Sequence, residues 1–421
     1  MPLPRRGGSH RRHRPEGAMS SCNLPANIVA DILSRLPVKS LVRFRCVCKP
    51  LKTLFADPKF IATHYNRTKN NHTLLVHSRH ASSANQTISL LHTKTPDSAP
   101  NLDHPFPPHF IVSDMEIVGS INGLVCLDSP PLSVLLTIWN PATKQYRYLP
   151  CPTIGNFHPD SVNTISTGFA FDSVKNDYKV IRIVCFKKEL GILARAEVFS
   201  VNSCAWREIK VDLDVMFDFN WVAVVKGVPY WMGLTQDINE FFFWFDAVNE
   251  VFRQLPAPCI AANHGTRLRA VNYKDSFAML VYSAGHVPFT LDGFQGTYYT
   301  PLEGNTNYVD VWVMEEKDSG GESSWSKKLA VGPILGVERL VGCSQNGEIV
   351  VENSEGMLLV YNPSTEEVKN VGINGAQAHS FLVCGYSESL VSMRGFVRVG
   401  TLDAKFIKQF DKEDRKNRYR C

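Results

Sequence analysis

Apolar residues near the start of the chain recur at the spacing of a helix. They follow one another at intervals of about four, which places them on one stripe of an amphipathic helix. The stripe consists of Ile28, Val29, Ile32, Leu33 and Leu36. Pro37 ends this predicted helix, because a proline disfavours the α conformation in the residue before it.

Three shorter helices are predicted after Pro37. The apolar stripe of the second consists of Leu41, Val42 and Cys46. The third begins near Pro50, since the first helical turn does not need the missing N–H. Asp57-Pro58 has the sequence of an N-cap and the first residue of a fourth helix. A unit of about forty residues has little core of its own, so its remaining apolar surface must contact the rest of the chain or another protein.

The pattern changes from about residue 110 to residue 395, where short apolar or alternating runs are separated by turn signals. No long helical period extends over this region, and the pattern is typical of an all-β domain. Two earlier strands are predicted at 74–76 and 87–91, before a loop at 94–109 that contains five prolines.

The β region repeats itself. Each copy has an apolar strand, a turn led by Asn or Asp and a second strand, and the copies begin at residues 139, 199, 245, 311 and 360. Asn and Asp favour such turns because their side chains hydrogen-bond the backbone two residues on. The intervals fit the four-stranded blades of a propeller. We expect six blades if a strand near 381–391 joins those at 74–91, with four tryptophans in the core: Trp206, Trp231, Trp312 and Trp325.

Composition is that of an ordinary globular chain of two or three domains, with 421 residues of which 44% are hydrophobic and 20% charged. No apolar run reaches the roughly 18–20 residues that a membrane span needs. No such run follows the N-terminal arginines either, so we expect no secretory signal. The eleven cysteines are scattered without a Cys-x-x-Cys spacing. This predicts reduced thiols in the cytoplasm or nucleus, and neither a structural zinc site nor a RING.

The net charge of +5 is unevenly distributed. Residues 1–20, 21–66 and 403–421 carry +4, +5 and +3, which leaves −7 for the body between 67 and 402. A nucleic-acid-binding body is expected to have a basic face, so nucleic acid is not a predicted partner. The tails at 1–20 and 396–421 are interpreted as solvated and flexible, with a nuclear import signal as the alternative.

No catalytic, cofactor or metal motif stands out. Gly320-Gly321 lacks the strand–loop–helix context of a phosphate-binding loop. None of the cysteines or histidines lies in a nucleophile signature. We therefore expect a non-enzymatic chain without a cofactor.

Both regions resemble parts of one protein family. The helical region at 21–66 resembles an F-box, through Leu24-Pro25, Ile32–Leu41 and Arg43–Lys49. The β region at 72–395 resembles the F-box-associated, kelch-like domain of plant F-box proteins. The matching segments there are Gly119–Leu127, Gly168–Asp172, Asn176–Arg182, Val309–Met314 and Leu358–Pro363. The resemblance extends to the F-box/kelch-repeat members and to those named for constitutive expression of pathogenesis-related genes.

This resemblance implies the substrate receptor of an SCF-type (Skp1–cullin–F-box) ubiquitin ligase. The residues expected to dock on the Skp1 adaptor are Leu24, Pro25, Ile28, Ile32, Leu33, Leu36, Pro37 and Leu41. The β domain would capture a protein target, and ubiquitin transfer would occur on other subunits. Two alternatives stay open: a propeller hydrolase or lyase whose turnover the F-box controls, and an F-box complex without a cullin.

A long connection in the β region is the predicted target-binding segment. Residues 283–307 separate two predicted strands, whereas connections are usually about 4–6 residues long. Glycines and aromatic residues in one loop are a composition that binding loops use. The aromatic residues are Phe289, Phe294, Tyr298 and Tyr299. The alternative is an insertion without function.

Overall fold

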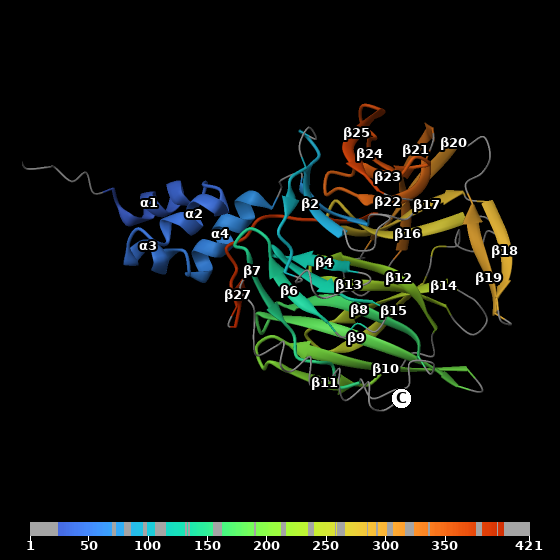
Figure 1. Cartoon of the computed structure of the whole chain (residues 1–421), viewed down its shortest axis with the longest axis horizontal. Helices are drawn as coiled ribbons and strands as arrows, with labels where there is room; N and C mark the ends of the chain where they lie inside the picture. Colours follow the sequence, from blue (N-terminus) through green and yellow to red (C-terminus); the bar gives the residue numbers. More distant parts are fainter. Residues whose placement is uncertain are drawn as a thin grey trace, which may run out of the picture.

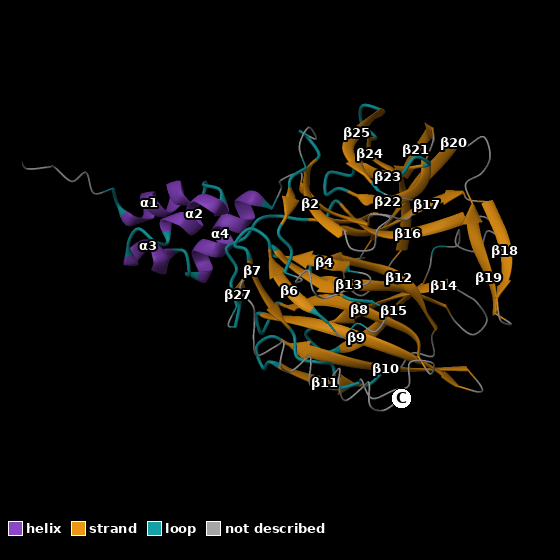
Figure 2. Cartoon of the chain, in the orientation of Figure 1, coloured by secondary structure: helices purple, strands orange, loops and turns teal. Residues whose placement is uncertain are grey.

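A computed structural model shows four helices followed by a β-propeller (Figure 1). The residues it describes are 24–69, 73–79, 86–95, 99–105, 115–130, 133, 135–154, 162–188, 191–211, 216–234, 240–256, 258, 266–283, 285–291, 294–300, 306–315, 324–335, 337–375, 381–393 and 395–399. In this part of the chain every helix lies before residue 69 and every strand after it (Figure 2). The predicted fold class, helices followed by a six-bladed all-β domain, is confirmed.

Four helices form in the predicted order, but the first ends at Leu33, so Leu36 of the predicted stripe lies in the turn before Pro37. Their bounds are Ala26–Leu33 for α1, Val38–Phe44 for α2, Lys49–Leu54 for α3 and Pro58–Thr68 for α4. The side chain of Asp57 caps α4 by accepting a hydrogen bond from the N–H of Lys59 at 2.9 Å. Cys46, which the sequence places on the stripe of the second helix, instead follows the end of α2 and is exposed.

The strands of the described chain form six sheets of four or five strands and one sheet of two. The first blade contains β26 (Phe381–Gly385), β1 (Thr73–Arg79), β2 (Gln86–His92) and β3 (Asn101–Leu102). The second contains β4 (Glu116–Ile121), β5 (Leu124–Asp128), β6 (Thr137–Asn140), β7 (Gln145–Tyr148) and β27 (Val397–Arg398). The third contains β8 (Val162–Asp172), β9 (Asp177–Lys188), β10 (Gly191–Ser200) and β11 (Ala205–Ile209).

The other three blades repeat the same antiparallel order. The fourth contains β12 (Met216–Val225), β13 (Val228–Leu234), β14 (Glu240–Asp246) and β15 (Val251–Pro256). The fifth contains β16 (Thr266–Tyr273), β17 (Ser276–Ser283), β20 (Thr306–Glu315) and β21 (Ser324–Leu335). The sixth contains β22 (Val337–Cys343), β23 (Ile349–Asn353), β24 (Met357–Asn362) and β25 (Glu367–Asn374).

The ring is closed by strands from both ends of the chain. The inner strands β26, β4, β8, β12, β16 and β22 line a central channel of about 150 Å³. β26 pairs with β1, with Leu75 opposite Cys384 and Val76 opposite Val383. This is the pairing predicted between the strands near 74–78 and 381–391. It joins the two ends of the chain in one sheet and covers the edge of β1.

The repeated Asn- and Asp-led turns follow one geometry. The Oδ1 atom of Asp246 accepts hydrogen bonds from the backbone N–H groups of Val248 and Asn249 at 3.0 and 3.1 Å. Four residues after the start of the turn, Glu250 has a φ of 58° and its N–H donates to the carbonyl of Asp246 at 2.7 Å. A type I turn followed by a left-handed residue is a common hairpin connection. The same geometry follows Asn362.

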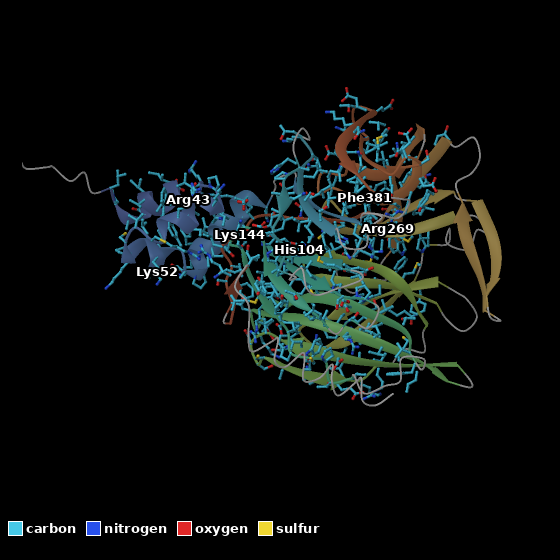
Figure 3. All side chains as sticks on the ribbon, viewed as in Figure 1. Arg43, Lys52, His104, Lys144, Arg269 and Phe381 are labelled. Carbon is cyan, nitrogen blue, oxygen red and sulfur yellow. The ribbon has the colours of Figure 1, made fainter. Side chains whose placement is uncertain are left out.

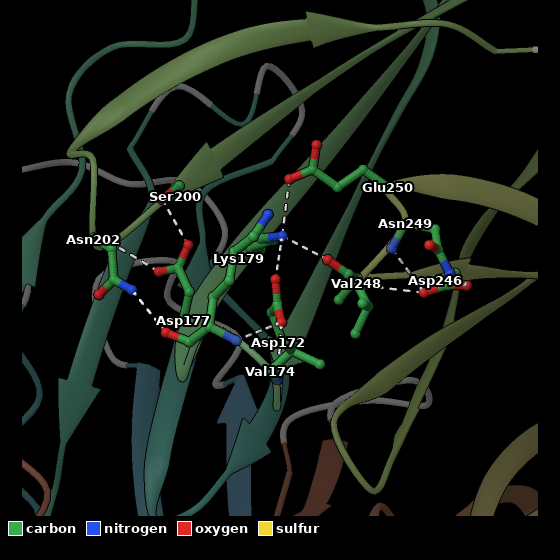
Figure 4. A network of polar contacts seen from close by, with 12 residues as sticks. Asp172, Val174, Asp177, Lys179, Ser200, Asn202, Asp246, Val248, Asn249 and Glu250 are labelled. Atoms are coloured by element: carbon green, nitrogen blue, oxygen red, sulfur yellow. Dashed lines mark hydrogen bonds and ion pairs between the residues drawn. The ribbon is translucent and has the colours of Figure 1, made fainter.

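Neighbouring blades are joined by aromatic stacking and by a buried ion network. Trp231 stacks on Phe243 with ring centroids 5.3 Å apart, and a Cβ atom at Gly168 of the third blade would overlap this indole ring. Lys179, almost fully buried, pairs with Asp172 at 2.9 Å in its own blade and with Glu250 at 2.8 Å in the next (Figure 4). A buried charge is tolerated only when it is paired in this way.

The connection at 283–307, which the sequence predicts as a loop, contains a separate hairpin. β18 (Gly285–Leu291) pairs with β19 (Phe294–Thr300), and Leu291 lies opposite Phe294. Asp292-Gly293 between them is the sequence signal for a two-residue hairpin. The hairpin lies on the side of the propeller away from the helices (Figure 1).

Candidate functional site

Exposed apolar side chains gather on the helical module. Leu24, Ile28 and Ile32 are 54%, 43% and 48% exposed, and the two isoleucines lie one helical turn apart on α1. Five of the eleven exposed large hydrophobic residues in the described chain fall between positions 24 and 47. Exposed apolar side chains grouped in this way favour an interaction surface.

The predicted docking residues divide between this surface and the core beneath it. Pro25 and Pro37 are exposed like the three residues above, and Leu36 is half-buried. Leu33 and Leu41, in contrast, are 9% and 0% exposed and pack with Val38, Phe55 and Phe60. These two leucines therefore hold the helices together and cannot contact a partner directly in this conformation.

Two exposed apolar residues were not among the predicted docking residues. Phe44 ends α2 and Val47 lies in the turn before α3, and they are 37% and 70% exposed. Both fall inside the Arg- and Cys-rich segment of the motif, but periodicity could not distinguish them from core residues. We include them as candidates for the same surface.

The surface around the apolar residues is basic. Lys39, Arg43, Lys49 and Lys52 are exposed on α2, α3 and their flanks, and Figure 3 shows Arg43 and Lys52 on the helical module. Asp31, one of the two carboxylates in the described helical module, is already engaged: Arg67 and Arg35 donate hydrogen bonds to it at 2.5 and 2.9 Å and lower its pKa. An apolar partner with an acidic rim would complement this surface.

The helical module is joined to the propeller by the segment that follows β26. Leu390 of this segment is fully buried in the helical core, against the cluster that contains Leu33 and Leu41. Thr68 at the end of α4 donates to the carbonyl of Glu388 at 3.3 Å, and Ser387 donates to the carbonyl of Lys69 at 3.1 Å. The core of the module therefore includes a residue more than 300 positions away in sequence.

The propeller holds the same segment from its other side. Asn140 donates from Nδ2 to the carbonyls of Ser389 and Val391 at 3.0 and 2.8 Å. Gly123, at a φ of +78°, allows the closest approach, because a Cβ atom there would overlap Ser389. The helices and the propeller are thus fixed to each other through residues 387–391.

The second candidate surface is the face opposite the helices. In each antiparallel blade, the first turn joins the two inner strands at one end of the blade. The next connection, from the second strand to the third, lies at the other end. Asp275, in the turn after β16, lies in the same cleft as α4, so the hairpin β18–β19 after β17 lies at the far end. Phe289 is placed on β18, and Phe294, Tyr298 and Tyr299 on β19; their side chains lie outside the described part.

The described residues contain no cluster of three or more His, Cys, Asp or Glu side chains placed to hold a metal ion. Burial raises the pKa of the thiols of Cys343 and Cys384 to about 12, so both stay protonated near neutral pH and are poor nucleophiles. No helix of the described chain is long and apolar enough to cross a membrane.

A small helical module with an exposed apolar face, fixed to a six-bladed propeller, defines the architecture of this chain. Family comparison identifies both parts. Residues 21–63 match the F-box domain, and residues 65–394 match the F-box associated beta propeller domain. The chain belongs to the F-box proteins with an F-box-associated propeller.

Several proteins of Arabidopsis thaliana are similar over most of their length. The F-box protein CPR1 is 35% identical over 335 residues, covering 73% of both chains. The F-box protein At3g07870 is 24% identical, covering 84% of this chain and 88% of its own. The F-box/kelch-repeat protein At3g23880 is 23% identical, covering 81% of this chain and 88% of its own.

Solved structures show only remote likeness. Puromycin hydrolase has a TM-score of 0.39 at 10% identity, covering 72% of this chain and 52% of that chain. The Dos1 propeller has a TM-score of 0.31 at 10% identity, covering 78% of this chain and 86% of that chain. Neither likeness assigns an activity to this chain.

Proposed function

We propose that this protein is the target-recognition subunit of an SCF-type ubiquitin ligase, working in the cytoplasm or nucleus. The observation that carries the proposal is the exposed apolar face of α1 on an F-box module. Leu24, Ile28 and Ile32 offer a partner a stripe of helix surface, the usual mode by which helices bind in apolar grooves. The partner is a Skp1-type adaptor, which connects the chain to a cullin.

The chain itself is non-enzymatic in this proposal. Ubiquitin transfer takes place on other subunits, so the propeller needs only to hold a protein target. Its connection to the F-box through Leu390 and the hydrogen bonds of residues 387–389 fixes the direction in which the target is presented. The target would bind on the far face, where the β18–β19 hairpin extends from the fifth blade.

The first prediction tests the adaptor contact. Replacing Ile28 and Ile32 together with Asp should reduce affinity for a Skp1-type adaptor by more than about a hundredfold, because burying unpaired charge in an apolar contact costs several kcal/mol. Leu36 is left unchanged because it packs against the helical core. Binding is measured by calorimetry with purified adaptor.

The control for this experiment is Val174→Asp, which introduces an aspartate at a propeller residue that is 76% exposed. It should bind the adaptor like the wild type, and all variants should melt alike. Adaptor binding by the double variant at wild-type affinity would show that α1 is not the docking surface. Co-purification then distinguishes the two kinds of complex. A cullin recovered with the adaptor indicates a ligase subunit, and an adaptor recovered without a cullin indicates an F-box complex of the other kind.

The second prediction concerns the target. Replacing residues 285–305 with a short Gly/Ser linker should abolish capture of the ubiquitinated target, since this removes the hairpin with Phe289, Phe294, Tyr298 and Tyr299. Adaptor affinity and the melting temperature should not change, because the hairpin forms a sheet of its own. Target capture is measured by affinity purification with the proteasome inhibited. Undiminished ubiquitination of the captured target would place recognition elsewhere on the propeller.

A further inference from the structure

A cleft of about 1340 Å³ lies between α4 and the propeller. Its propeller wall is formed by turns that join the inner two strands of successive blades, with one residue from each of five blades: Asn122, Asn176, Lys226, Asp275 and Gln345. Its other wall is the side of α4 that carries Ile61, Ala62 and Tyr65. Ligand sites are commonly clefts between domains, with volumes of about 300–1,000 Å³, so this cleft is large enough for a small molecule.

Positive charge exceeds negative charge in the lining. Lys69, Arg147 and Lys226 line the cleft, and Asp275 is the one acidic residue in its described lining. Lys69 and Lys226 are exposed, and no ion-pair partner is found for either ammonium group among the described residues. An anion that entered the cleft would therefore meet cations whose charge is not already neutralised by a neighbouring carboxylate.

Two phenols of the lining, the buried Tyr178 and the half-buried Tyr65, add neutral hydrogen-bond donors. The amide of Asn122 donates from Nδ2 to the hydroxyl oxygen of Tyr178 at 3.1 Å, which leaves the Tyr178 hydroxyl hydrogen for another acceptor. Burial raises the pKa of both Tyr178 and Tyr65 to about 12, and Asp275 adds to the effect at Tyr65. Both phenols therefore keep their protons at neutral pH. Hydrogen bonds from such donors to a charged acceptor are stronger than those between neutral groups.

Apolar surface lies beside these donors. Phe171, Ile61 and Met393 line the cleft and are half-buried. An aromatic ring, an aliphatic side chain and a thioether suit an apolar body, whereas the donors suit a negative group. The lining thus combines the two halves of an amphipathic anion site.

We propose that the cleft between α4 and the inner-strand turns binds a small organic acid, an aromatic or alicyclic body that carries one carboxylate, sulfonate or phosphate group. The acidic group lies against Lys226, Lys69 and Tyr178, and the apolar body lies against Phe171 and α4. Such a ligand contacts α4 together with Phe171 and Tyr178 of the third blade and Lys226 of the fourth, and it stabilises the arrangement of the helical module on the propeller. This inference does not depend on adaptor binding or on the identity of the target.

The test uses the full chain and 2-naphthalenesulfonate, a flat ring with one fixed negative charge, in calorimetric titration. The wild type should bind with saturation at one site. Lys226→Asn and Tyr178→Phe should each weaken binding about tenfold or more, since each removes a donor to a charged acceptor. Asn tolerates the positive φ of 49° at position 226, so the exposed turn should keep its shape. The uncharged analogue 2-naphthalenesulfonamide should bind at least about tenfold more weakly than the anion.

Three further variants identify the place of binding. Ala62→Trp places an indole ring in the cleft from the exposed side of α4 and should weaken binding by blocking the surface beside that helix. Lys369→Gln and Tyr308→Phe make the matched changes at exposed residues outside the cleft and should bind like the wild type. Wild-type titration without saturation, or undiminished binding by Ala62→Trp or by the Lys226→Asn variant, would overturn the proposal.

Discussion

Single buried polar residues connect elements that are distant in sequence. Lys179 pairs with Asp172 of its own blade and with Glu250 of the next, and Ala247 accepts a further hydrogen bond from its ammonium group at 2.5 Å. Arg182 and Glu197 form a second pair at 2.8 Å, and both side chains are completely buried. Removing one member of such a pair leaves an uncompensated charge at a cost of about 3–5 kcal/mol. These pairs therefore select one arrangement of neighbouring strands and blades.

His77 on β1 gives a prediction at the residue scale. Burial, followed by the charge of Arg79, lowers the pKa of His77 from 6.5 to about 4. The unfolded chain therefore takes up a proton below about pH 6.5, whereas the folded chain does so only near pH 4. The contribution of neutral His77 to the free energy of unfolding is therefore complete above pH 6.5. It decreases as the pH falls toward 4, by up to about 1.4 kcal/mol per pH unit.

Urea unfolding at pH 7.5 and at pH 5.0 measures this effect. The wild type should lose more stability over the interval than His77→Gln, whose amide stays neutral throughout. His92→Gln, a change at an exposed end of β2, should behave like the wild type. An equal loss in the wild type and in His77→Gln would mean that His77 does not carry the pH dependence.

At the scale of elements, the segment after β26 completes the helical module. Leu390 is buried among helix residues, so Leu390→Ala should lower the free energy of unfolding of the helices by about 2–5 kcal/mol through the lost contacts and the cavity. Hydrogen exchange should quicken in the amides of α1, α2 and α3 and stay slow in β8 and β9. The affinity of Leu390→Ala for the adaptor should also fall, because the helices that carry the docking surface are less stable.

The matched change Leu193→Ala removes the same atoms at a propeller residue that is 39% exposed. It should leave helix exchange as in the wild type. Unchanged exchange in the helices of Leu390→Ala would mean that the F-box folds independently of the C-terminal segment.

At the scale of the whole molecule, the propeller is one closed unit. Ending the chain before residue 381 removes β26, the inner strand of the first blade, together with the segment that holds the helices. The main cooperative thermal transition should then be lost, because the truncation exposes the edge of β1 and the apolar residues of the first and sixth blades that pack against β26. Ending the chain after residue 400 should preserve the transition. An unchanged melt after the first truncation would show that ring closure contributes little to stability.

The sequence by itself determined the local elements. Proline positions, the Asp57 cap and the four-residue spacing of Ile28 and Ile32 specified the helices, because helix formation depends on neighbours within a few residues. The Asn- and Asp-led turns and their spacing specified the blades for the same reason. Closure of the ring by 381–391 also followed from the sequence, because the repeat lacked a complete first blade. Asp292-Gly293 carried an unused signal for the β18–β19 hairpin.

Only the tertiary structure decided which residues of the helical stripe face a partner. Ile32 and Leu33 are adjacent and equally apolar, yet one is 48% and the other 9% exposed. The difference arises because helix packing and Leu390 cover one side of α1, and that contact joins residues more than 300 positions apart. The cleft beside α4 has the same origin, since its lining comes from five blades and a helix. Burial and charge at such places are sums over long-range contacts, which local spacing does not encode.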